Sequence, residues 1–140
     1  MSEIVDYTYL IKPLKKLAKV PPAKLGGVAC FLIKNGTIIS SGINHNPTGG
    51  PMEDVIDGKL VTRPEVVHAE IAALSAAEAN AIDVTGSILL LTMSPCLRCA
   101  KIIAATNVAE VSYLYDWWDK ASLDVLHAAG IRTKKLQEEL

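Results

Sequence analysis

One uninterrupted apolar segment constrains the fold more than any other part of this sequence. Residues Ser87 to Thr92 read SILLLT, with four large aliphatic side chains in succession. A strand with one face in water alternates apolar and polar residues, whereas a strand covered on both faces does not. The segment therefore predicts an interior strand of a sheet that carries helices on both faces.

The rest of the chain supplies further strands and helices for such a sheet. Strands are expected at 27–33, 37–43, 108–113 and 131–134. Helices are expected at 3–19, 65–81, 96–105 and 119–129. Asn35-Gly36 is a two-residue hairpin signal between the first two strands. The alternation of strands and helices predicts an α/β domain with a parallel or mixed sheet.

Punctuating residues set the expected helix ends. Pro64 suits the first turn of the second helix, with Thr62 or Arg63 near its cap, and Gly86 follows its end. Ser94-Pro95 predicts the start of the third helix, and Gly130 predicts the end of the last. The segment 44–62 is rich in Gly, Pro, Asn and Asp. We expect it to be a long functional loop.

Charge and hydropathy exclude several classes of function. The chain has 14 Lys+Arg against 15 Asp+Glu, without the basic excess that is typical of nucleic-acid-binding proteins. No segment approaches the roughly 18 apolar residues of a membrane span. Acidic residues precede lysines at the N-terminus, in the opposite order to a signal peptide. We therefore expect a cytoplasmic protein that binds neither nucleic acid nor a membrane.

Two short motifs, His68-Ala69-Glu70 and Pro95-Cys96-Leu97-Arg98-Cys99, carry the chemistry. Residues i and i+3 share a helix face, so both cysteine sulfurs can point at one ion. The positive helix end favours the thiolate that binds metal. One imidazole and two thiolates leave one tetrahedral position open, as in catalytic zinc sites. We expect one zinc ion per chain, and we expect Cys30 to pack in the core.

Glu70 lies two residues after His68 and need not bind the metal. A zinc ion with two thiolate ligands is formally neutral and acidifies its water less than a three-histidine site does. A neighbouring base is then useful, and Glu70 is placed to accept a proton from the attacking water and return it to a leaving group.

The HAE…PCLRC pattern resembles the zinc-dependent cytidine/deoxycytidylate (dCMP) deaminase family, whose signature is H-x-E…P-C-x-x-C. The resemblance covers roughly residues 24–135 and implies a three-layer α/β/α fold with a five-stranded mixed sheet. A length of 140 residues suits one domain, so we expect a single deaminase domain over residues 1–140. It also implies that His68, Cys96 and Cys99 hold zinc, and that Glu70 shuttles protons. The implied reaction is hydrolytic attack on an aminopyrimidine or aminopurine ring, with release of ammonia.

Further stretches, SGINHNPTG and SPCLRCAKII, resemble the dCMP deaminase branch. This likeness implies that Asn44 contacts a sugar hydroxyl, that the backbone at Ala69 and Ser94 brackets the base edge, and that dCMP is converted to dUMP. Ala72 departs from the branch, and HAEIAAL is similar to the tRNA adenosine deaminases. The alternatives are therefore a tRNA adenosine deaminase, another cytidine or modified-pyrimidine deaminase, or a zinc-stabilised binding module without activity.

Three further expectations concern the substrate and the partner copies. One or two cations would meet the phosphate of a nucleotide substrate, and the candidates are Lys24, Arg63, Arg98 and Lys101. Of Trp117 and Trp118, one is expected to line the base pocket and the other an interface. The aliphatic helices suggest a homo-oligomer, as the related deaminases form dimers, tetramers or hexamers. Its candidate surface residues are Ile102, Ile103, Leu123 and Leu126.

Overall fold

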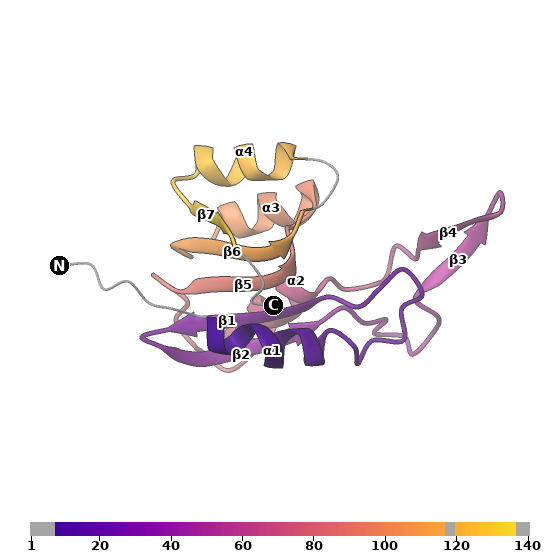
Figure 1. Ribbon diagram of the computed structural model, residues 1–140, viewed down its shortest axis with the longest axis horizontal. Helices are drawn as coiled ribbons and strands as arrows, with labels where there is room; N and C mark the ends of the chain where they lie inside the picture. Colours follow the sequence, from indigo (N-terminus) through magenta and orange to yellow (C-terminus); the bar gives the residue numbers. More distant parts are fainter. Residues whose placement is uncertain (1–7, 117–119, 137–140) are drawn as a thin grey trace.

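A computed structural model gives the arrangement of the chain and describes residues 8–116 and 120–136. Five strands form one mixed sheet in the order β2-β1-β5-β6-β7 (Figure 1). Strand β1 pairs antiparallel with both β2 and β5, whereas β5, β6 and β7 run parallel. The strand bounds are β1 Ala29–Lys34, β2 Thr37–Ile43, β5 Ile88–Met93, β6 Glu110–Tyr115 and β7 Arg132–Lys135. The predicted five-stranded mixed sheet is confirmed.

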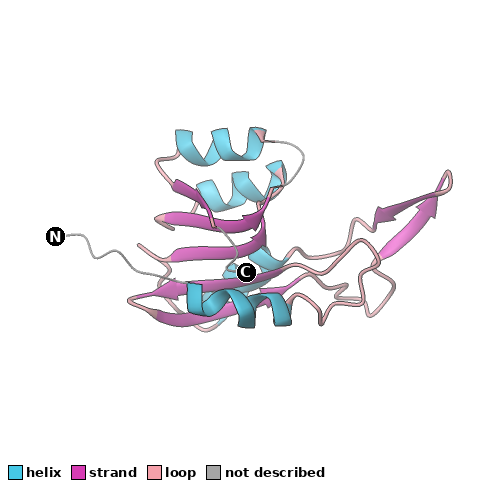
Figure 2. Cartoon of the chain, in the orientation of Figure 1, coloured by secondary structure: helices cyan, strands magenta, loops and turns pink. Residues whose placement is uncertain are grey.

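Helices cover both faces of this sheet (Figure 2). One face carries α1, whose Leu10 and Leu14 pack against alternate side chains of β1. The other face carries the remaining helices, whose buried side chains share a second cluster with Leu32 of β1. The helix bounds are α1 Thr8–Leu17, α2 Ala69–Ala79, α3 Leu97–Ala104 and α4 Ala121–Ala128. The predicted three-layer α/β/α architecture is confirmed.

The central strand β5 lies between these two clusters. Leu90 packs on the α1 side, whereas Leu89 and Leu91 pack on the side of the other helices. All three are fully buried, as the SILLLT segment predicts. Ile103 and Leu126 are also fully buried in the core. Their assignment to an oligomer surface is wrong, because α3 and α4 need them to cover the sheet.

The hairpin between β1 and β2 turns at Asn35 and Gly36, as predicted. Both residues have positive φ, at 53° and 75°, which is the backbone that a tight two-residue turn requires. A second hairpin, formed by β3 (Glu53–Ile56) and β4 (Lys59–Thr62), lies within the expected loop. Its turn, Asp57-Gly58, repeats the positive φ values of the first. We call β3 and β4 the arm, since they project away from the sheet (Figure 1).

Helix α2 is shorter than predicted at both ends. It begins after His68 rather than near Thr62 or Arg63, because Val67 makes two backbone hydrogen bonds with His45 that hold the preceding segment extended. It ends at Ala79 rather than before Gly86. The backbone turns at Ala81, where φ is 55°.

The other two predicted helix ends have different outcomes. Helix α3 is capped by Cys96 rather than Ser94, and it begins at Leu97 rather than at Cys96. Helix α4 ends just before Gly130, whose φ of 78° fits the predicted C-terminal stop.

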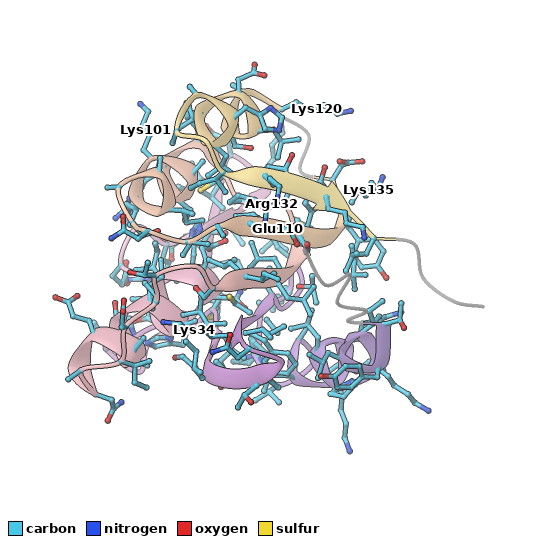
Figure 3. All side chains as sticks on the ribbon, turned by 90° about the vertical axis from the view of Figure 1, so that its left-hand side faces the viewer. Lys34, Lys101, Glu110, Lys120, Arg132 and Lys135 are labelled. Atoms are coloured by element: carbon cyan, nitrogen blue, oxygen red, sulfur yellow. The ribbon has the colours of Figure 1, made fainter. Side chains whose placement is uncertain are left out.

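Ion pairs join the parallel strands at the far edge of the sheet. Arg132 of β7 lies 3.4 Å from Glu110 of β6 (Figure 3), and Lys135 pairs with Asp116 just beyond β6. Within the described part of the chain, every helix is too short or too polar to cross a bilayer.

Candidate metal centre and active site

The metal-binding motifs meet because two helices begin at the same place. His68 is the N-cap residue of α2 and Cys96 is the N-cap residue of α3. Cys99 lies in the first turn of α3, on the face that Cys96 also occupies. The ligand atoms of these three side chains lie within 4.8 Å of one another. The structure therefore brings together the three residues that the sequence proposed as zinc ligands.

The donor atoms fit a tetrahedral zinc ion. The Nδ1 atom of His68 lies 3.7 Å from the sulfur of Cys96 and 3.2 Å from that of Cys99. Zinc bonds of about 2.0 Å to nitrogen and 2.3 Å to sulfur, at the tetrahedral angle, separate the two donors by about 3.5 Å. The two measured distances lie on either side of this value, so the cluster needs little movement to accept the ion.

Hydrogen bonds within the cluster shift the pKa values of the two thiols in opposite directions. A hydrogen bond from Cys99, followed by one from His68, lowers the pKa of Cys96 to about 4. The same contact with Cys96 raises the pKa of Cys99 above its ordinary value. His68 in turn has a raised pKa, chiefly through its hydrogen bond to Cys96. The cluster therefore favours the thiolate form of Cys96, and a bound cation would favour the thiolate form of both cysteines.

Glu70 lies next to this cluster and is almost completely buried. Its side chain is 4 % exposed, and its Oε1 atom lies 3.9 Å from Nδ1 of His68. Burial raises the pKa of this carboxyl group above its ordinary value, because removal from water disfavours the charged form. A carboxylate that holds a proton more readily than usual, beside a metal-ligand cluster, is suited to proton transfer.

A cavity of about 300 Å³ opens onto Glu70 and the metal-ligand cluster. Its walls include the three residues that the sequence assigned to the sugar and the base, namely Asn44, Ala69 and Ser94. Asn44 is fixed by its side-chain oxygen, which accepts a hydrogen bond of 2.8 Å from the backbone of Val28. The walls also include residues that were not predicted: Leu25, Gly26, Gly27, Val28, Thr62, Val66 and Met93. The Gly26-Gly27 pair before β1 is the one sequence signal that could have indicated a close backbone wall.

Other candidate residues have mixed outcomes. Cys30 is fully buried in the core on β1 and lies outside the metal-ligand cluster, as expected. Arg63 is paired with Asp54 at 2.9 Å and with Glu65 at 2.6 Å, so it is not available to a phosphate. The two tryptophans, Trp117 and Trp118, lie outside the described residues.

Comparison with known proteins identifies the family. The family model described as the cytidine and deoxycytidylate deaminase zinc-binding region matches residues 4–115. The chain belongs to the cytidine and deoxycytidylate deaminase family. The enzymes of this family are zinc-dependent deaminases, and a His/Cys/Cys zinc site is typical of them.

Relatives named deoxycytidylate deaminase align over most of the chain. The enzyme of Enterobacteria phage T2 is 28% identical, over 93% of this chain and 88% of its own length. The Homo sapiens enzyme is 31% identical, over 71% of this chain and 57% of its own length. Among solved structures, the dCMP deaminase of cyanophage S-TIM5 in complex with dCMP and dUMP is 30% identical, with a TM-score of 0.77 and coverage of 93% of both chains.

The metal-ligand cluster predicts how the zinc content responds to substitution. We expect the purified protein to contain one zinc ion per chain by elemental analysis. Cys96→Ala and His68→Ala remove a donor and are expected to lower the zinc content well below this value. Cys30→Ala is the matched control, because it deletes a thiol outside the cluster and is expected to retain the zinc. Equal zinc content in all four proteins would contradict the assignment.

Proposed function

We propose that this protein catalyses the hydrolytic deamination of a deoxycytidine nucleotide, with dCMP and water giving dUMP and ammonia. The observation that carries the proposal is the placement of Glu70 beside the His68, Cys96 and Cys99 cluster in the wall of a cavity. The relatives named deoxycytidylate deaminase, and the cyanophage structure that holds dCMP and dUMP, support this choice of substrate.

In this proposal His68, Cys96 and Cys99 hold one zinc ion. When bound, zinc supplies a water that is acidic enough to act as a nucleophile at neutral pH. Glu70 accepts the proton that this attack on C4 of the base releases, and it delivers a proton to the departing amino group. The placement of Glu70 suits both transfers, because its carboxyl group lies beside the metal ligand His68 and lines the cavity that would hold the base.

The substrate contacts follow the layout of the cavity. Ala69 is the first residue of α2, and N–H groups in the first turn of a helix have no partner within the helix. This backbone and Ser94 are assigned to the edge of the base. Asn44 is assigned to a sugar hydroxyl, since its oxygen is engaged with Val28 and its NH₂ group can donate.

The phosphate needs a cation that the cavity wall itself does not supply. All fourteen Lys and Arg residues lie in the described part of the chain, and none of them is among the residues that line the cavity. Lys24 is exposed and directly precedes the lining residues Leu25 and Gly26. Four residues further along the chain, the backbone of Val28 holds Asn44, which is assigned to the sugar. We assign Lys24 to the phosphate.

Substitution of Glu70 tests the proton shuttle. Glu70→Gln keeps the size of the side chain but cannot carry the proton, so we expect kcat to fall by about 10²–10⁴-fold. The zinc content should stay at that of the wild type. Glu78→Gln is the matched control, because it changes an exposed carboxylate at the other end of the same helix. Full turnover by zinc-loaded Glu70→Gln would exclude this role.

A second prediction concerns the substrate. Ammonia release should be measured with dCMP, CMP, deoxycytidine, 5-methyl-dCMP and a tRNA anticodon stem. We expect the highest kcat/KM with dCMP and little turnover of deoxycytidine, which lacks the phosphate. Activity on the tRNA stem without activity on any mononucleotide would refute the proposal.

Lys24→Gln extends this measurement to the phosphate. A charge-assisted hydrogen bond contributes about 1.5 kcal/mol or more, so we expect kcat/KM for dCMP to fall about tenfold or more. Turnover of deoxycytidine should not change. Lys101→Gln is the control, since Lys101 extends away from the body of the protein (Figure 3). Equal effects of Lys24→Gln on both substrates would exclude the assignment.

We also propose that the protein is a homo-oligomer. The arm exposes apolar side chains that its own chain does not cover, with Val55 70 % and Ile56 52 % exposed. Leu60 and Val61 of β4 are exposed as well. A two-stranded hairpin in isolation is marginally stable in water, and contact with further copies would stabilise it.

Light scattering tests the oligomer. We expect a mass that is a multiple of 15.0 kDa, and we expect the double variant Val55→Asp with Ile56→Asp to dissociate. Val20→Asp is the control, because Val20 is similarly exposed but lies outside the arm. A monomeric wild type would exclude the homo-oligomer. An undissociated double variant would exclude the arm as its contact.

A further inference from the structure

Helix α2 approaches the edge strand β2 more closely than a side chain would allow. A methyl group at Gly42 would lie 2.3 Å from the carbonyl oxygen of Ala69 and 2.5 Å from the backbone nitrogen of Ala73. It would also lie 2.9 Å from the Cβ atom of Ala72. Gly42 is not among the glycines with positive φ. The position requires glycine for space rather than for an unusual backbone conformation.

The same face of β2 also holds the helix by a hydrogen bond. Ser40 precedes Gly42 by two residues, and alternate residues of a strand share a face. The hydroxyl of Ser40 donates to the carbonyl oxygen of Ala73 over 2.7 Å. The helix meets this strand with a row of small residues, since Ala69, Ala73 and Ala77 are all fully buried. Gly42 therefore permits the close approach, and Ser40 fixes it.

The atoms on the two sides of this contact belong to the candidate active site. Ala69 lies between His68 and Glu70 in the first turn of α2. Just past the end of β2, Asn44 follows Gly42 by two residues and lines the cavity. The separation of β2 from α2 thus sets the distance between Asn44 and the Glu70 carboxylate.

The contact is also in register with the strand that leads to the cysteines. Cys30 of β1 pairs with Gly42 on one side and with Leu91 of β5 on the other. Strand β5 then runs to Ser94 and Cys96 at the start of α3. One row of the sheet therefore positions both His68 and Cys96, and a shift of α2 away from Gly42 would displace His68 from the cysteines.

We propose that Gly42 and Ser40 are positioning residues for the deamination. They hold the first turn of α2 at the distance from the sheet at which His68 meets Cys96 and Cys99, and at which Glu70 faces the base. This inference rests on the proposed function for its kinetic consequences. Its geometric consequence, the arrangement of the metal ligands, is independent of the substrate.

The test compares Gly42→Ala and Ser40→Ala with Gly86→Ala. The control strains the backbone at a φ of 75°, in open space, and outside the elements that carry the metal ligands. It is expected to lower Tm without changing kcat. A misplacement of about 1 Å can reduce a rate by about 10²-fold. We therefore expect Gly42→Ala to lower kcat by about tenfold to a hundredfold, even where its Tm equals that of Gly86→Ala.

The second readout is the visible spectrum of the Co²⁺-substituted protein, which reports the arrangement of the ligands. We expect the spectrum to change in Gly42→Ala and to stay unchanged in Gly86→Ala. Addition of Ala72→Gly to Gly42→Ala removes one of the three close contacts but leaves both backbone contacts, so we expect no rescue. Rescue would place the effect in the Ala72 side chain and overturn the inference.

Ser40→Ala adds no atom and keeps the chain able to fold, so it decides the question if Gly42→Ala does not fold. We expect a smaller decrease in kcat than in Gly42→Ala, with zinc retained, and a shifted Co²⁺ spectrum. Wild-type kcat and spectrum in whichever of the two variants folds would overturn the inference. A wild type that is inactive on dCMP, with a Co²⁺ spectrum that still changes in the variants, would refute the substrate and not the positioning role.

Discussion

The burial of strand β5 on both faces is the constraint from which the active site follows. Leu89, Leu90 and Leu91 alternate between the two hydrophobic clusters, and each contributes about 1.5–3 kcal/mol of burial free energy. A slip of one residue would exchange their faces and remove this packing. The strand is therefore fixed along its length, and its carboxyl end delivers Ser94 and Cys96 to one defined place at the start of α3.

The ionisable groups gathered at the start of α3 lower the stability of the folded chain when no metal is bound. Glu70 is an almost completely buried carboxyl group, and burial raises its pKa. The sulfur atoms of Cys96 and Cys99 compete for a proton, so that one pKa falls and the other rises. A divalent cation favours the charged forms of both thiols and of the neighbouring carboxylate. The metal would thus stabilise the folded chain as well as supply chemistry, since the ligands come from two separate helices.

Local signals explain why much of the fold and the metal-ligand cluster could be predicted. The SILLLT strand and the Asn35-Gly36 turn depend on short-range patterns, and a Cys-x-x-Cys pair on one helix needs no long-range contact. The start of α2 could not be predicted, because the bridge between His45 and Val67 joins segments that are distant in sequence. The arm was missed although Asp57-Gly58 is a hairpin signal, since β4 is exposed throughout and lacks the alternation of a half-buried strand.

The arm and the cavity share their structural supports. Glu53 of β3 accepts a hydrogen bond from the backbone of the lining residue Leu25 over 3.1 Å. Thr62, the last residue of β4, lines the cavity itself. Arg63 then pairs with Asp54 of β3 and with Glu65, which closes the base of the arm. The arm is therefore joined to two walls of the cavity, at Leu25 and at Thr62. If further copies of the chain cover the apolar side chains of the arm, the same contacts would also help to fix the shape of the substrate site.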